Sequence, residues 1–139
     1  MYPYLRMIWG WQSAKTLSKI AIDEMHVSSH RCWPQDIDMW MELNNGRTLT
    51  MYDLGRIPMA VRMGLFDVLK ANRWGLTVAG SVVRYRRRIR PFEKFEMRSR
   101  GLFWDEKFLY VEQSIWKKNG ECANHAVLRT AVTDKNGIV

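Results

Sequence analysis

The chain has 139 residues, of which 47% are apolar and 26% are charged, and its formal net charge is +8. This composition predicts one globular domain with a single hydrophobic core and excludes a disordered chain. The positive charge favours anionic partners such as nucleic acid, acidic lipid or phosphate-bearing small molecules. No apolar run reaches the roughly 18 residues that a membrane-spanning helix requires, so we expect no stable membrane insertion.

The first 25 residues form an N-terminal extension to a core domain predicted over residues 26–139. Apolar side chains at helical spacing predict a short helix whose apolar face packs on the protein's own body, with contact to a membrane surface as the alternative. The residues of that face are Tyr4, Leu5, Ile8 and either Trp9 or Trp11. A small-residue cleavage site is missing, so we expect no signal peptide.

A first strand is predicted over residues 26–33, and Pro34 ends it because proline has no N–H to donate to a sheet. Asn44 and Asn45 are then suitable N-cap residues for a helix that begins near Gly46.

This helix is expected to bury one stripe of side chains and to expose its charged residues. The buried stripe is Leu49, Tyr52 and Met51, and the residues on other faces are Arg47, Asp53 and Arg56. Pro58 bends the helix or begins a second one, because it removes a backbone donor. A further helical segment is predicted over residues 65–71.

Four strands are predicted to follow, because β-branched and aromatic residues alternate between turn signals. They cover residues 76–90, 94–104, 107–117 and 122–133, and Asn119-Gly120 forms a hairpin turn. The order of one strand, a long helix and a four-stranded antiparallel meander predicts an α+β fold with the helix on one face of the sheet.

The strongest chemical signal lies at the start of the long helix. Asp36 and Asp38 follow the first strand and precede the Asn-Asn-Gly helix start. Backbone N–H groups at a helix start bind an anion or polarise a carbonyl group, and a nearby carboxylate acts as a base or nucleophile. The structural alternatives are a turn carboxylate for Asp38 and a loop-stabilising acid for Asp36.

The densest basic run extends from Arg84 to Arg90. On a strand its alternate members, Arg84, Arg86, Arg88 and Arg90, would share one face. They either form a solvated strand end or contact the phosphate groups of a ligand.

Other catalytic patterns are not indicated. The three histidines, His26, His30 and His125, show no metal-ligand spacing, and neither a Gly-x-Ser-x-Gly motif nor a glycine-rich phosphate loop occurs. We expect no metal and no cofactor. The two cysteines lie outside any motif and fit a cytoplasmic location.

The helix-start segment resembles the hotdog-fold acyl-CoA thioesterases of the 4-hydroxybenzoyl-CoA thioesterase branch, whose motif is Asp-x-Asp-x-x-Gly-His-x-Asn-Asn-x-x-Tyr. The matching positions are Asp36, Asp38, Met41, Glu42, Asn44, Asn45 and Thr48. The segment WMELNNGR, followed by YDLGR, is similar to the family called thioesterase superfamily member 6 and its bacterial relatives.

The resemblance implies a hotdog fold, in which a five-stranded antiparallel sheet wraps a long helix. It implies an acyl-CoA substrate and a homodimer or homotetramer whose sheets join edge to edge, with each active site between subunits. Asp38 would act as general base or nucleophile, and the N–H near Asn45 would polarise the thioester carbonyl. The substrate-binding candidates are Asn44, Arg86, Arg88 and Arg90.

Three positions depart from the family motif: Met41 replaces glycine, Glu42 replaces histidine and Thr48 replaces tyrosine. Glycine permits a close backbone approach that methionine does not. If Glu42 and Asp38 face one cavity, their repulsion raises one pKa and makes a proton donor–acceptor pair; otherwise Glu42 is an exposed acid.

Hydrolysis of an acyl-CoA thioester to free acid and CoA is the first hypothesis. The alternative is a non-catalytic acyl-CoA or acyl-chain binding module, which the three departures support. Nucleic-acid binding is disfavoured because no recognition motif accompanies the charge. Hydration of an enoyl thioester is disfavoured because it would need histidine at the position of Glu42.

Overall fold

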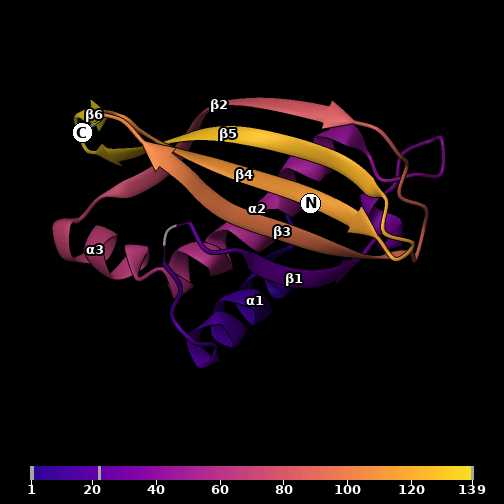
Figure 1. The fold of residues 1–139 in the computed structure, drawn as a ribbon, viewed down its shortest axis with the longest axis horizontal. Coiled ribbons are helices and arrows are strands. Elements are labelled where there is room, and N and C mark those ends of the chain that lie inside the picture. Colours follow the sequence, from indigo (N-terminus) through magenta and orange to yellow (C-terminus); the bar gives the residue numbers. More distant parts are fainter. Residues whose placement is uncertain (1, 22, 139) are drawn as a thin grey trace.

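An antiparallel sheet lies against the long helix α2 in the computed structural model, which describes residues 2–21 and 23–138 (Figure 1). The elements in chain order are α1 (Tyr4–Thr16), β1 (His26–Arg31), the 3-10 helix η1 (Pro34–Asp36), α2 (Asn45–Arg62), α3 (Leu65–Asn72), β2 (Gly75–Tyr85), β3 (Lys94–Trp104), β4 (Phe108–Lys117), β5 (Cys122–Asp134) and β6 (Gly137–Ile138). The predicted α+β class is therefore confirmed.

The strands are ordered β1-β3-β4-β5-β2, with the short β6 added beside β5. β3, β4 and β5 form a meander, but β2 pairs with β5 rather than with β3. The predicted four-stranded meander is therefore wrong for β2. The chain between β2 and β3 crosses to the other side of β4 and β5, and it buries Ile89 on the way.

Strand β2 is shorter than predicted, because its ladder ends at Tyr85 rather than at Arg90. Arg86 and Arg87 both direct their backbone N–H groups to the carbonyl oxygen of Ala123, each at 2.9 Å. Two consecutive residues therefore oppose a single residue of the next strand. This irregularity turns the chain away from the sheet.

Helix α2 begins at its predicted cap, but Pro58 does not begin a second helix. Asn44 is the N-cap, as predicted, and the helix continues through Pro58 to Arg62. At Gly55 the helix approaches β3 so closely that a side chain there would collide with Met97 and Ser99. The glycine thus sets the distance between helix and sheet.

The predicted stripe of α2 is partly correct. Met51 and Tyr52 are fully buried, whereas Leu49 is exposed. Arg56 was expected outside the core but is buried, because its Nη1 donates to Gln113 Oε1 at 3.0 Å and its Nη2 pairs with Asp53. A polar network thus crosses the helix–sheet interface.

Helix α1 packs on α2 with the opposite face from the one predicted. Tyr4, Leu5, Ile8 and Trp9 are all exposed, whereas the alternative Trp11 is half-buried with its ring 4.5 Å from that of Phe66. Besides Met7, which packs against the core, the inward face uses small residues: Ala14 is buried, and Gly10 approaches Pro58. Because glycine and alanine contribute little to apolar periodicity, the pattern favoured the wrong face. Among the helices described, none is long and apolar enough to cross a membrane.

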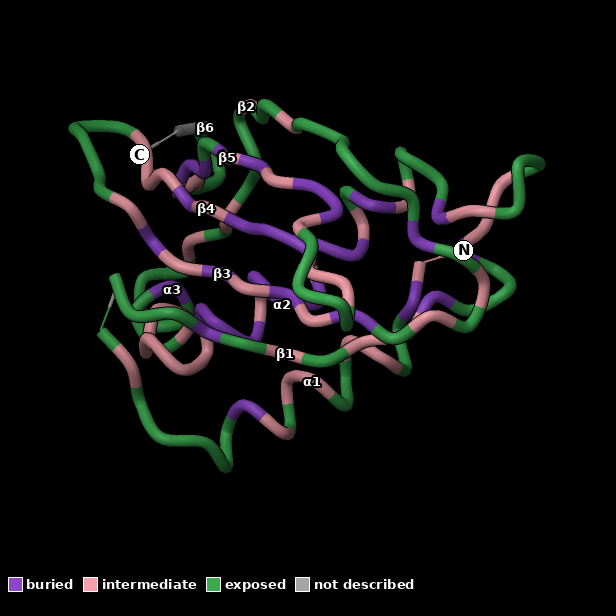
Figure 2. The backbone as a smooth tube through the Cα atoms, turned by 45° about the vertical axis from the view of Figure 1, so that its right-hand side comes forward, coloured by how far each residue is buried: buried purple, intermediate pink, exposed green. Residues whose placement is uncertain are grey.

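The two edges of the sheet differ in how they are covered. β1 lies beside α1 and α2, whereas every residue of β2 is exposed or only half-buried (Figure 2). Val82 of β2 retains 75% of its side-chain exposure. β2 is therefore an apolar edge strand without a covering layer among the described residues.

Candidate active site

The Asp-x-Asp segment forms a small hairpin between β1 and α2. Ile37 pairs with Leu43 in an isolated antiparallel bridge. The N–H of Asp38 donates to the carbonyl of Glu42 at 2.9 Å, and the N–H of Met41 donates back to the carbonyl of Asp38 at 3.1 Å. The tip of the hairpin, which includes Met39 and Trp40, is exposed.

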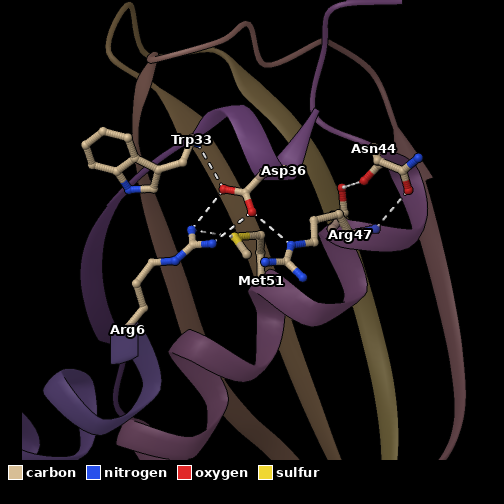
Figure 3. Close-up of polar contacts among 7 residues, drawn as sticks. Arg6, Trp33, Asp36, Asn44, Arg47 and Met51 are labelled. Carbon is tan, nitrogen blue, oxygen red and sulfur yellow. Dashed lines mark hydrogen bonds and ion pairs between the residues drawn. The ribbon is translucent and has the colours of Figure 1, made fainter. Parts of the chain in front are cut away.

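Asp36 is the buried anchor of this hairpin (Figure 3). Arg6 from α1 donates to both carboxylate oxygens at 2.9 and 2.8 Å, and Arg47 Nε donates to Oδ1 at 2.8 Å. The backbone N–H of Trp33 donates to Oδ2 at 3.0 Å. Burial alone raises the pKa of Asp36, but the hydrogen bonds from Arg6, Trp33 and Arg47 outweigh it and hold that pKa below its ordinary value.

Asp38 is half-buried, and its Oδ1 accepts the N–H of Trp40 at 2.8 Å. This is the local Asx turn of the structural alternative, and it leaves the second oxygen, Oδ2, outside the turn. At the next bend Met41 adopts φ 58°, a left-handed conformation. Met41 therefore takes a backbone conformation that glycine adopts without steric cost, despite its side chain.

The N-terminus of α2 is capped, but only in part. Asn44 Oδ1 accepts the N–H of Arg47 at 3.1 Å, and the carbonyl of Asn44 accepts the N–H of Thr48 at 2.9 Å. The N–H groups of the first two helical residues, Asn45 and Gly46, have no acceptor in the part of the chain that the structure describes. These two groups are available to an anion or to a polarised carbonyl oxygen.

A polar pocket of about 240 Å³ opens beside this helix start. Its lining residues are Glu42, Leu43, Asn45, Thr48, Tyr85, Arg86, Arg87, Arg88, Ile89 and Asn124. Three consecutive arginines therefore form one wall. Arg88 Nε lies 2.9 Å from Glu42 Oε2, and Arg87 Nε lies 2.6 Å from Glu121 Oε2.

The pocket contains four of the predicted site residues: Glu42, Asn45, Arg86 and Arg88. Four others lie outside its lining: Asp36, Asp38, Asn44 and Arg90. Because Asp38 and Glu42 do not line one pocket within a protomer, the condition for a repelling carboxylate pair is not met there. The predicted face of four arginines is wrong, because the strand ends at Tyr85 and the later arginines lie on a turning loop.

Six of the lining residues were not among the predicted site residues, and Tyr85, Arg87 and Asn124 are three of them. Tyr85 donates its hydroxyl to the carbonyl of Asn45 at 2.9 Å, so it ties the end of β2 to the start of α2. Burial raises the pKa of Tyr85, which keeps that hydroxyl a donor. Arg87 lies between the arginines that strand alternation placed on one face, and that alternation fails beyond β2. Asn124, which accepts the hydroxyl of Tyr52, lies on β5 and has no local signal in the sequence.

The described side chains suit anion binding rather than metal binding. No group of three histidine, cysteine or acidic residues within the described ranges is placed to hold a metal ion. The arginine wall and the helix start at Asn45 instead place several donors around one small cavity. Such an arrangement binds phosphate groups and stabilises a developing oxyanion.

The fold and the start of α2 agree with a comparison to known protein families. Residues 32–136 match the thioesterase-like superfamily, and the chain belongs to that superfamily. It is 41% identical over 80 residues to protein THEM6 of Xenopus laevis, a match that covers 58% of this chain and 39% of the relative. It is 43% identical over 66 residues to thioesterase poxG of Penicillium oxalicum, covering 48% of this chain and 22% of that protein. The chain thus spans less than half the length of these curated relatives.

Solved structures show the same fold. The probable thioesterase YbaW from Escherichia coli superposes with a TM-score of 0.74 at 17% identity, covering 79% of this chain and 84% of that chain. The protein smu.793 from Streptococcus mutans UA159, bound to acetyl CoA, gives a TM-score of 0.65 at 10% identity, with 85% and 89% coverage. The expected hotdog fold and the relationship to THEM6 are therefore confirmed.

Proposed function

We propose that this protein hydrolyses an acyl-CoA thioester to a free acid and CoA at the N-terminus of α2. The observation that carries the proposal is the pair of open N–H groups, on Asn45 and Gly46, beside the arginine-walled pocket. The superfamily membership supports the reaction class.

In the proposed reaction the thioester carbonyl oxygen accepts hydrogen bonds from the N–H groups of Asn45 and Gly46. Asp38 either removes a proton from the attacking water or attacks the carbonyl carbon itself, which forms an anhydride that water then cleaves. In both routes the C–S bond breaks, and CoA leaves as a thiolate that takes up a proton. The N–H groups stabilise the tetrahedral oxyanion, because they are already oriented before the charge develops.

The arginines of the pocket wall supply the binding site for the CoA phosphates in this proposal. Arg86 and Arg88 line the pocket with guanidinium groups that match phosphate geometry. Acetyl CoA bound to the structural relative smu.793 supports this ligand class. Glu42 holds Arg88 at 2.9 Å, so we assign Glu42 a positioning role rather than proton transfer.

The proposed active unit is a homodimer, and two such dimers would make the homotetramer. Strand β2 is an open edge with exposed Val78 and Val82, and joining two such edges would cover them. Asp38 lies outside the pocket of its own protomer. A site between subunits would let Asp38 of one protomer act beside the helix start of the other.

The test is thioester hydrolysis across acyl-CoAs of increasing chain length by the wild type and by Asp38→Ala and Asp38→Asn. We expect both variants to lose at least about 100-fold in kcat/KM, because neither side chain acts as base or nucleophile. Asp67→Asn, at an exposed acid of α3, is the matched control and should retain full activity. Circular dichroism and Tm verify the fold of each variant.

Unchanged activity in both Asp38 variants would assign Asp38 to the turn alone. If the wild type hydrolyses no acyl-CoA yet binds a non-hydrolysable thioether analogue, the protein is the binding module instead. Rapid release of one equivalent of CoA before steady turnover would favour the anhydride route over the water route.

A further inference from the structure

A second and larger cavity lies between α1 and β1, at the sheet edge opposite β2. It is a groove of about 810 Å³, a volume within the range of small-molecule sites. It shares no lining residue with the polar pocket at the start of α2. The groove is therefore a separate feature of the molecule, and the hydrolysis proposed above does not use it.

Apolar side chains of α1 and α2 form much of its walls. Leu5 and Trp9 project from α1, while Leu54 and Pro58 of α2 form the floor. Leu5 and Trp9 are 84% and 73% exposed, although each lines a groove. An apolar ligand that covers these exposed side chains would remove apolar surface from water, which favours binding.

The charged residues that line the groove are all positively charged. Its charged lining residues are Arg6, Arg31 and Lys94, and no aspartate or glutamate lines it. Arg6 is already paired with Asp36, which leaves Arg31 and Lys94, on the neighbouring strands β1 and β3, as the cations nearer to solvent. A ligand with one anionic end and a long apolar part would match both properties of the groove.

A buried donor without a partner among the described residues lies at the other end of the groove lining, since His26 begins β1 and Arg31 ends it. His26 lines the groove and is 3% exposed. Arg62 Nη1 lies 2.9 Å from His26 Nδ1, so this nitrogen accepts and the proton resides on Nε2. Burial and the nearby Arg62 lower the pKa of His26 to about 4, which keeps the ring neutral. His26 Nε2 finds no acceptor in the part of the chain that is described.

We propose that this groove binds a long-chain carboxylate, with the alkyl chain between α1 and the floor formed by α2. The carboxylate lies at the end marked by Arg31 and Lys94. The occupant is a single-chain fatty acid rather than a peptide, because the walls are apolar and every formal charge in the lining is positive. The site is a binding site and not a second catalytic site.

The experiment measures binding of cis-parinaric acid, a fluorescent fatty acid, below its critical micelle concentration, with palmitate as competitor. Trp9→Glu places a negative charge at the exposed groove wall and should weaken binding by at least about tenfold. Ile8→Glu is the matched control, because Ile8 is an exposed apolar residue of the same helix that does not line the groove. It should bind as the wild type does.

A second pair of variants tests the carboxylate. The double variant Arg31→Ala/Lys94→Ala should lose affinity for palmitate but not for hexadecanol, which has the same chain without the charge. Lys15→Ala/Lys19→Ala removes two exposed cations outside the groove and should change neither affinity. Asp38→Ala should also keep palmitate binding, which separates this site from the proposed catalytic one.

Three outcomes would overturn the proposal. The first is the absence of saturable binding by the wild type, and the second is equal weakening by Trp9→Glu and Ile8→Glu. The third is a change of oligomeric state in Trp9→Glu alone, which would make the groove a subunit interface.

Discussion

Arg6 donates to both carboxylate oxygens of Asp36, at 2.9 and 2.8 Å, and so joins α1 to a loop 30 residues further along the chain. Arg47, in the first turn of α2, completes the arrangement from the other side at 2.8 Å. One buried acid therefore fixes three segments: the N-terminal helix, the hairpin that carries Asp38, and the start of α2. This role of Asp36 is one of positioning, and it has measurable consequences.

Asp36→Asn should destabilise the fold by about 3 kcal/mol, because it leaves two guanidinium groups without their buried counter-charge. Urea unfolding at neutral pH measures this change. Asp67→Asn, which removes an exposed acid, should change the unfolding free energy by less than about 0.5 kcal/mol. A loss below about 1 kcal/mol in Asp36→Asn would show that water or another group replaces the carboxylate.

The same carboxylate predicts a pH dependence. Its folded-state pKa is lowered from an ordinary value of 3.8, so its stabilisation is complete above that value and is lost as the pH falls through the folded-state pKa. Between about pH 5 and pH 2 the wild type should therefore lose more stability than Asp36→Asn. Parallel curves for the two proteins would contradict the assignment.

Met41→Gly should stabilise the protein by about 1 kcal/mol, because Met41 holds φ 58° at the exposed hairpin tip and glycine adopts this conformation without steric cost. Met39→Gly is the matched control in the same turn, since Met39 is not among the residues with positive φ. There the added chain entropy should cost roughly 0.5–1 kcal/mol. Thermal unfolding of both variants measures the difference, and the same sign in both would refute it.

The arginine loop provides another matched pair. Arg88 lines the polar pocket, whereas Arg90 does not. Arg88→Ala should raise KM for acyl-CoA about tenfold through loss of a charge-assisted phosphate contact, and Arg90→Ala should change it by less than about twofold. Steady-state kinetics at constant ionic strength compares them. Equal effects would indicate general electrostatic attraction rather than a bound phosphate.

The open edge of β2 predicts the assembly. Val82→Asp should shift the protein from dimer to monomer, because it places a charge at the centre of the proposed sheet-to-sheet contact. Val27→Asp makes the same change on β1, the opposite edge strand, and should leave the dimer intact. Light scattering coupled to gel filtration reports the mass of each. Dissociation by Val27→Asp instead would move the interface to the β1 side.

Local signals accounted for the elements and for the start of α2. The predicted bounds of β3, residues 94–104, are those observed, and Asn44 caps α2 because a short polar side chain before an apolar helix is a local signal. The place of β2 depended on pairing with β5, a long-range contact that no local pattern specifies. Burial of Arg56 likewise depended on Gln113, which lies 57 residues away in the chain.

The candidate site was likewise predictable from the sequence only in part. The helix start and its asparagines were predictable, because the motif and the capping preference agree there. The pocket wall was not, because it forms where β2 ends against Ala123 of β5. Asp36 had been grouped with the catalytic candidates, but its burial and its contacts with Arg6 and Arg47 separate its position from that of Asp38.

The link between Arg6 and Asp36 also decides where the molecule tolerates chemical labelling. A fluorophore or a surface attachment next to Leu5 would lie within one helical turn of the residue that holds the hairpin. An attachment at Asn136, an exposed residue before β6, lies at the end of the sheet far from that hairpin (Figure 1). Immobilisation for binding or force measurements should therefore use the turn before β6, where an attachment does not disturb the contact between Arg6 and Asp36.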